Sequence, residues 1–125
     1  MSFKWSFRGF DATGQKGWVY GDLVHNQKVT CEGLEPRVMV GGYEVVPESV
    51  GICIGKTDDH DNILYEGDIC KIACYGRLFL AVIVYVDFKG SFGFMSDSCF
   101  SYFDYASTIQ RVGTLYENKQ LLSNH

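Results

Sequence analysis

The sequence predicts a mainly β protein, with an N-terminal β-hairpin region followed by a small C-terminal β-barrel. Three observations carry this prediction: period-2 alternation of apolar and polar residues recurs along the chain, helical periodicity is scarce, and 19 aromatic residues stand against only 2 prolines. A chain of 125 residues fits one domain. We expect that domain to cover 1–125, with a subdivision into an N-terminal β-rich region, 1–61, and the barrel, 62–125.

The first predicted element is a β-hairpin. In FKWSFRGF, Phe3, Trp5 and Phe7 fall on one face of a strand because aromatic and polar residues alternate. DATGQKG then turns the chain, and WVYGDLVHN, residues 18–26, runs back as the partner strand. The next segment, QKVTCEGLEPRVMVGGYEVV, consists of strand pieces broken by Gly33, Pro36 and a Gly-Gly pair.

An acidic stretch, KTDDHDN, separates the two predicted regions. A calcium loop starting at Asp58 would need Gly at its sixth position and Glu at its twelfth, where this chain has Ile63 and Ile69. Asp and Asn tolerate the backbone dihedrals of turns, and apolar strands flank the stretch. The acidic stretch is therefore predicted to be a hairpin loop and not a metal site.

The barrel is predicted from the segment that follows. EGDICKIAC is a strand, YGR a tight reversal, and LFLAVIVYVDF an eleven-residue strand too apolar to face water along its whole length. FGFM and TIQRVGTLYE supply further strands. Four or five short strands with tight reversals predict a partly open SH3-like barrel.

Five cysteines are expected to be buried thiols, because their number is odd and their spacing forms no disulfide framework. Cys70 and Cys74 lie four residues apart, about 13 Å along a strand. Two thiolates on one zinc ion must lie within about 4.6 Å of each other. We therefore expect no metal and no other cofactor.

The net charge of −4 is concentrated in residues 31–68, which carry two basic and nine acidic side chains. No segment clusters the Lys and Arg residues on which phosphate binding depends, so duplex nucleic acid is a disfavoured partner. No apolar run reaches the roughly 18 residues that span a bilayer, and the N-terminus lacks the pattern of a signal peptide. We expect a soluble cytoplasmic protein without membrane contact.

Four blocks in order, FRGFDATGQKGWVYGDLVHN, VVPESVGICIGKTD, ILYEGDICK and RVGTLYENKQLL, resemble the signature blocks of the YopX family of small phage and prophage proteins. They extend from residue 7 to residue 122, nearly the whole chain. The resemblance implies one YopX-like domain with an SH3-like barrel, in the cytoplasm of a bacterial host cell, and implies no assigned activity. The chain departs from the family pattern at DDHDN, where Asn-Gly is common, and at Lys119, where a Pro often follows YEN.

Candidate catalytic groups are few. His25 could act as a base for Cys31, but a lone histidine at the end of a strand is far more often a surface residue. Glu66 and Asp68 flank a glycine that marks a turn, where Asp68 can bond to backbone amides. The phosphate-binding glycine loop, the GxSxG elbow and the HExxH motif are all missing from the sequence. The chain is predicted to be non-catalytic.

Aromatic residues are the feature that points to a function. Between Tyr85 and Tyr105, eight of 21 residues are aromatic. In CFSYFDY these side chains cannot all share one strand face, so some are expected at the surface, where aromatics anchor protein interfaces. We predict a binding surface for a protein partner, which is a second copy of the chain, a host protein or a phage protein. Its candidate residues are Phe92, Phe94, Phe100, Tyr102, Phe103 and Tyr105.

Single-stranded nucleic acid is the alternative partner, because its bases stack on exposed aromatic rings. It requires nearby cations, and the candidates are Arg77, Lys89 and Arg111, which are opposed by three nearby aspartates. A third class, a small enzyme, would need His25 or His60 in a pocket beside a carboxylate or thiol.

Overall fold

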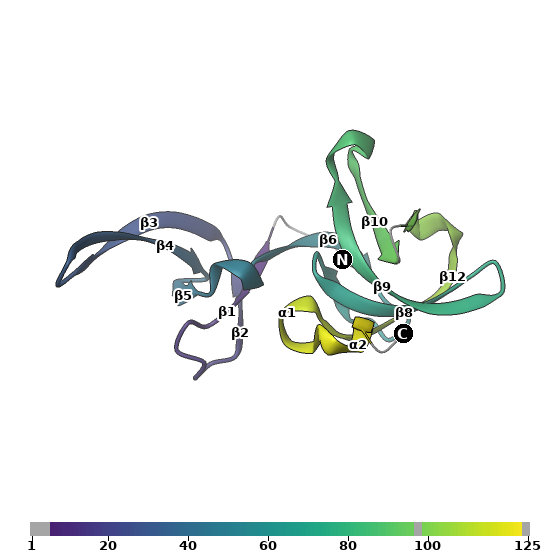
Figure 1. The fold of residues 1–125 in the computed structure, drawn as a ribbon, viewed down its shortest axis with the longest axis horizontal. Coiled ribbons are helices and arrows are strands. Elements are labelled where there is room, and N and C mark those ends of the chain that lie inside the picture. Colours follow the sequence, from purple (N-terminus) through teal and green to yellow (C-terminus); the bar gives the residue numbers. More distant parts are fainter. Residues whose placement is uncertain (1–5, 97–98, 124–125) are drawn as a thin grey trace. The chain divides into compact units, whose positions relative to one another are not determined.

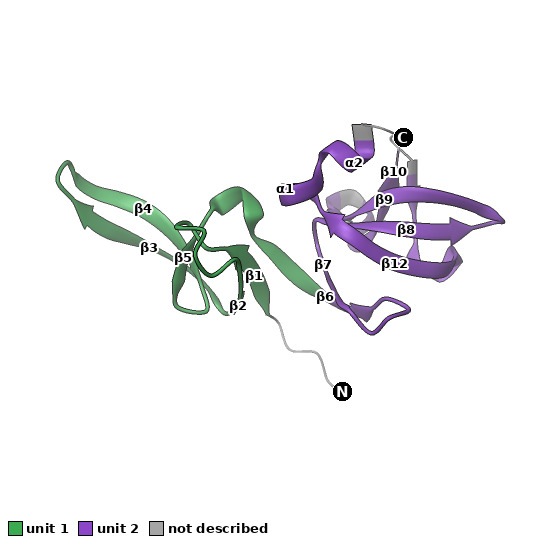
Figure 2. Ribbon diagram, turned by 90° about the horizontal axis from the view of Figure 1, so that it is seen from below, with its two compact units in different colours: residues 1–53 green, residues 54–125 purple. Residues whose placement is uncertain are grey.

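The computed structural model describes residues 6–96 and 99–123, and these residues form several antiparallel β-sheets with only short helices. The predicted mainly β fold class is confirmed. The chain divides into two compact units, one up to Cys53 and one from Ile54 (Figure 2). The expected boundary between the two regions at residue 61 falls inside the second unit. The acidic stretch belongs to this unit because it is hydrogen-bonded to the last strand of the unit.

The first unit contains five strands, a short 3-10 helix and the beginning of a sixth strand. Their bounds are β1 (Phe7–Phe10), β2 (Trp18–Gly21), β3 (Leu23–Thr30), β4 (Gly33–Val40), β5 (Tyr43–Val45), the 3-10 helix Pro47–Ser49, and β6 (Gly51–Thr57), which continues into the second unit. β1 pairs with β2 and with the start of β6, while β3, β4 and β5 form a three-stranded sheet in that order. Val19, Val40 and Val45 form the core of this unit.

The predicted second strand of the hairpin, residues 18–26, is two strands in two different sheets. The first part pairs with β1 and the second with β4, and the break falls at Asp22. Gly21 has a positive φ of 144°, and a Cβ on it would lie 2.8 Å from the Cα of Gly41. Because neither glycine has a side chain, the backbone segments at Gly21 and Gly41 can approach each other closely. A side chain on Gly21 would prevent this approach. Phe3 and Trp5 of the predicted first strand lie outside the described residues.

The second unit holds the remaining strands (Figure 1). Their bounds are β7 (Ile63–Tyr65), β8 (Asp68–Cys74), β9 (Arg77–Val86), β10 (Ser91–Ser96), β11 (Cys99–Ser101) and β12 (Ala106–Thr114), with 3-10 helices at Asp87–Lys89 and Phe103–Tyr105 and helical turns α1 (Leu115–Asn118) and α2 (Gln120–Ser123). Five strands form one antiparallel sheet in the order β11-β10-β9-β8-β12. β12, the last strand of this sheet in the sequence, thus pairs with β8, which is the first.

β9 covers most of the predicted apolar strand and packs on both faces. Ala81 and Ile83 lie in the core with Leu64, Ile72 and Phe94. The alternate residues of β9 face the other side of the sheet, and Val82 among them is only 8% exposed. The middle of β9 is therefore covered on both faces, which explains why its sequence is apolar without alternation there.

The last predicted strand is shorter than expected. β12 ends at Thr114, and Leu115–Asn118 form the helical turn α1. The Thr114 hydroxyl accepts a hydrogen bond from the Glu117 N–H at 3.1 Å, and the Asn118 side chain accepts one from the Thr114 N–H at 3.0 Å. This N-cap turns the chain out of the strand.

Candidate interaction surfaces of the second unit

The acidic stretch is the predicted hairpin loop between β6 and β7, and Asp58 is its centre. The Asp58 side chain is buried and accepts hydrogen bonds from the N–H groups of His60 and Asn62 and from the Asn62 side chain. It also accepts one from the Arg111 N–H in β12 at 2.9 Å. Burial raises the pKa of this carboxyl, but the hydrogen bonds outweigh burial and lower the pKa to about 2.

The neighbouring carboxylate of Asp59 strengthens the same connection. It accepts a hydrogen bond from the Ile109 N–H at 3.0 Å, while the Asp59 N–H donates to the Ile109 carbonyl at 2.9 Å. The hydrogen bonds of Asp58 and Asp59 therefore attach the loop to β12. Within the described ranges, no group of three or more His, Cys, Asp or Glu residues could hold a metal ion.

The structure does not bring His25 and Cys31 together as a base and a nucleophile. Cys53, Cys70 and Cys74 are buried as predicted, whereas Cys31 is exposed because it lies in the turn between β3 and β4. His25 is exposed on β3, six residues before Cys31, or about 20 Å along a strand. The Asp68 side chain is fully buried and accepts a hydrogen bond from the Tyr65 N–H at 2.8 Å.

Four aromatic rings of the second unit form a continuous series, which we call the aromatic ladder: Phe100, Tyr102, Tyr105 and Tyr75. Successive ring centroids along this series lie 5.0, 6.3 and 5.8 Å apart. Tyr75 is 80% exposed, Tyr105 54% and Tyr102 40%, so most of the ladder faces solvent. The residues of the ladder come from β11, from the 3-10 helix Phe103–Tyr105 and the residue before it, and from the turn between β8 and β9.

Tyr75 lies in a backbone conformation that its residue type disfavours. It has φ of 52° and Gly76 has φ of 77°, so both central residues of this two-residue hairpin turn have positive φ. Turns of this kind favour Asn, Asp or Gly at both positions. A non-glycine residue held in this region costs on the order of 1 kcal/mol, and such strain concentrates at functional positions.

The six predicted partner-binding residues do not lie together. Phe100, Tyr102 and Tyr105 belong to the ladder. Phe94 is 1% exposed and packs in the core against Phe103 with ring centroids 4.5 Å apart, so the expectation that Phe94 contacts a partner is corrected. The half-buried Phe92 lies outside the ladder and contacts Tyr85 at 5.0 Å.

Sequence reasoning missed Tyr75. The sequence predicts a tight reversal at YGR, and a bulky residue at the centre of a two-residue turn has no strand neighbour to cover it. A bulky residue at the centre of a predicted tight turn therefore indicates an exposed ring.

The three predicted cations are separated. The Lys89 ammonium lies 5.4 Å from the ring centroid of Phe100 and 5.7 Å from that of Tyr102. Arg77 begins β9 and Lys89 follows its end, so nine strand residues, 78–86, lie between them. The Arg111 guanidinium donates to the Ile63 carbonyl at 3.3 Å. Lys89 is therefore the candidate that the structure places against the ladder.

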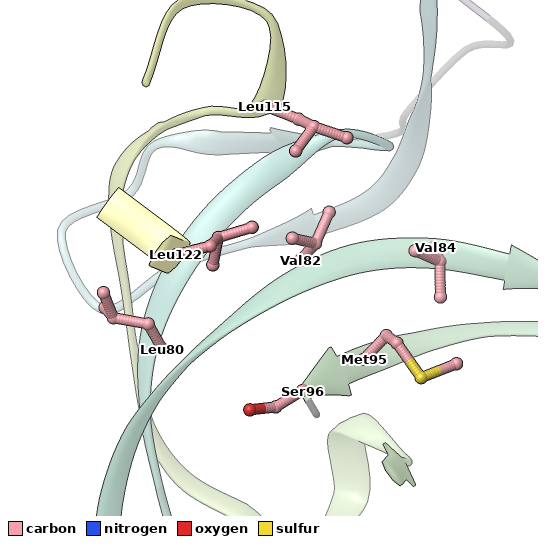
Figure 3. A pocket seen from close by; sticks show the side chains of 7 residues that line it. All are labelled: Leu80, Val82, Val84, Met95, Ser96, Leu115 and Leu122. Atoms are coloured by element: carbon pink, nitrogen blue, oxygen red, sulfur yellow. The ribbon is translucent and has the colours of Figure 1, made fainter. Parts of the chain in front are cut away.

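An apolar pocket of about 310 Å³ lies on the sheet face opposite to the core residues Ile83 and Phe94 (Figure 3). Its lining comes from β9, β10, α1 and α2 and consists of Leu80, Val82, Val84, Met95, Ser96, Leu115 and Leu122. Its volume is at the lower end of small-molecule sites, and the Ser96 hydroxyl is the one polar side-chain group among these residues. Apart from the Ser96 hydroxyl, the lining residues carry no group able to act as an acid, base or nucleophile.

No helix among the described residues has the length and apolar character needed to cross a bilayer. Comparison with known protein families and with curated proteins finds no match. The chain is similar to the crystal structure of protein EF1440 from Enterococcus faecalis, with a TM-score of 0.57 and 20% sequence identity over 97% of this chain and 99% of that one. At this identity the similarity supports the fold alone.

Proposed function

We propose that the chain is a non-catalytic interaction module of the YopX type, acting in the cytoplasm of a bacterial host cell, and that the aromatic ladder binds a segment of a partner protein. The observation that carries the proposal is Tyr75, a strained residue that is 80% exposed and whose ring lies 5.8 Å from that of Tyr105. Exposed aromatic rings lose little conformational entropy on binding and anchor many protein interfaces.

The electrostatics of the second unit favour a protein partner over a nucleic acid. Residues 54–125 carry six basic and nine acidic side chains, a net charge of −3. A binder of nucleic acid normally neutralises phosphates with clustered cations. A partner segment with apolar side chains and a few basic residues fits this unit better.

Binding of a displayed random peptide library to the immobilised chain tests the proposal. We expect enriched peptides with apolar anchors, and we expect their affinity to fall about tenfold or more when both Tyr75 and Tyr105 are replaced by alanine. Tyr43→Ala is the matched control, because Tyr43 is a 41% exposed tyrosine of the first unit. Enriched peptides that bind the double variant as well as the wild type would contradict the proposal.

Single-stranded nucleic acid remains the second candidate partner because Lys89 lies against two rings of the ladder. Exposed aromatic rings can stack with bases, while a basic group beside them binds the phosphates. A short mixed-sequence DNA strand should then quench tyrosine fluorescence in low salt, lose this effect in high salt, and bind more weakly to Lys89→Ala. Binding that is independent of salt and of Lys89 would exclude this candidate.

A further inference from the structure

The β3–β4 hairpin extends beyond β5 as a two-stranded ribbon, and β3 is the edge strand of its sheet (Figure 1). β5 pairs only with residues 38–40 of β4. Most side chains of residues 24–36 are exposed on both faces of the ribbon. An isolated two-stranded hairpin is marginally stable in water, so a ribbon of this length gains from a third strand.

The register determines which backbone groups of β3 are available for another strand. Residues 31 and 32 form a two-residue turn between Thr30 and Gly33, and the residues that flank such a turn exchange hydrogen bonds with each other. Because hydrogen-bonded pairs alternate along an antiparallel ladder, Lys28 and Asn26 also direct their backbone groups toward β4. His25, Gln27 and Val29 therefore direct their N–H and C=O groups away from β4, to the open edge.

The opposite edge of the ribbon is blocked by a proline. Pro36 is the partner of Gln27, so its nitrogen points away from β3, at a place that β5 does not reach. Proline removes the donor that an added strand would use, and proteins protect exposed edges in this way. β3 contains no proline and, among its eight residues, only Lys28 is formally charged at neutral pH. The two edges thus differ, and only the β3 edge is open to pairing.

We propose that the β3 edge pairs with the β3 edge of a second copy of this chain, in antiparallel register about a two-fold axis at Gln27. Gln27 then lies opposite Gln27 of the partner subunit, and His25 lies opposite the partner subunit's Val29. All three residues direct their backbone groups to this edge, so the pairing forms a continuous ladder of hydrogen bonds.

The side chains of β3 are compatible with this register. Lys28 lies opposite the partner subunit's Asn26, so no like charges are opposed. Val29 is 84% exposed and its cross-strand neighbour Leu34 is 64% exposed, and both share a sheet face with His25. Pairing about Gln27 brings this apolar pair next to the same face of the partner's ribbon. An axis at Val29 would pair fewer of the outward-directed residues.

Solution mass tests the pairing directly. The wild-type chain should show twice the monomer mass of 14.1 kDa in sedimentation equilibrium at concentrations up to about 0.1 mM, as expected for a modest interface. Gln27→Lys places two like charges opposite each other at the axis and should weaken the dimer about tenfold or more. Gln27→Glu should do the same. An equimolar mixture of the two variants should recover the dimer, because opposite charges then meet.

Gln15→Lys is the matched control, because Gln15 is exposed in a turn of the same unit and the variant carries the same added charge. It should leave the dimer unchanged, and circular dichroism should show that every variant retains its β structure. A wild-type monomer, a dimer that persists in Gln27→Lys, or a mixture that stays monomeric would overturn the proposal. The Tyr75 and Tyr105 variants should not alter the solution mass. The result of the mass measurement is therefore independent of the result of the peptide-binding test of the aromatic ladder.

Discussion

The Asp58 carboxylate accepts a hydrogen bond from the Arg111 N–H at 2.9 Å, and so connects the loop between β6 and β7 to a strand 53 positions later in the sequence. Three further hydrogen bonds from within the loop reach the same carboxylate. One buried side chain therefore determines the shape of the loop and its attachment to the barrel.

Asp58→Asn should destabilise the protein at neutral pH. The pKa falls from 3.8 to about 2 on folding, and at about 1.4 kcal/mol per pKa unit this corresponds to roughly 2 kcal/mol of unfolding free energy. Because the folded-state pKa is lowered, this contribution is fully present above about pH 4 and is lost as the pH falls through about 2. Urea unfolding of the variant and the wild type at pH 7, 4 and 2.5 measures the difference.

The matched control for this variant is Asp61→Asn, which makes the same chemical change in the same loop at an exposed residue with φ of 64°, a conformation that asparagine tolerates. It should leave the unfolding free energy nearly unchanged. A difference between wild type and Asp58→Asn that stays constant from pH 7 to 2.5 would contradict the role of the Asp58 carboxylate.

Tyr75→Asn should stabilise the protein while weakening partner binding. Asparagine suits the positive φ of this turn, and a ring that is 80% exposed contributes little burial, so we expect a gain of roughly 0.5 to 1 kcal/mol in unfolding free energy. Thermal unfolding measures the gain. Tyr105→Asn removes the same ring contact but leaves the turn unchanged, so it should give no gain in unfolding free energy. A loss of stability in Tyr75→Asn would show that the turn is not strained.

Phe94→Ala should lower the unfolding free energy by about 3 to 5 kcal/mol, because the ring is 1% exposed and the surrounding core cannot close over the cavity. Phe92→Ala, two residues earlier on the same strand, removes a half-buried ring and should cost clearly less. Denaturant unfolding of both variants separates the core aromatic from the surface aromatic. Equal losses would contradict the assignment of Phe94 to the core.

Thr114→Ala should loosen the helical turns that border the apolar pocket. Loss of an N-cap hydroxyl costs about 1 kcal/mol, and α1 and α2 each contribute one leucine to the pocket lining. We expect increased binding of the dye ANS to the native variant, because the apolar face of β9 becomes more accessible. Thr108→Ala, at an exposed position of β12, serves as the control and should bind no more dye than the wild type.

The local features of the fold could be predicted from the sequence, because alternation and turn residues act over short distances. The acidic loop and the buried apolar strand are examples. The bond from Asp58 to Arg111 could not be predicted, since nothing near either residue indicates the other. The same limit explains why Phe94 and Phe92 could not be told apart: both lie on one strand, and their exposure depends on the strands and helices that pack against them.

The pairing of β8 with β12 also has a consequence for the growing chain on the ribosome. Residues 68–74 form their second ladder only after residues 106–114 have been synthesised. Until then the apolar strands β8 and β9 leave the tunnel with one edge unpaired, at a stage when exposed strand edges favour aggregation.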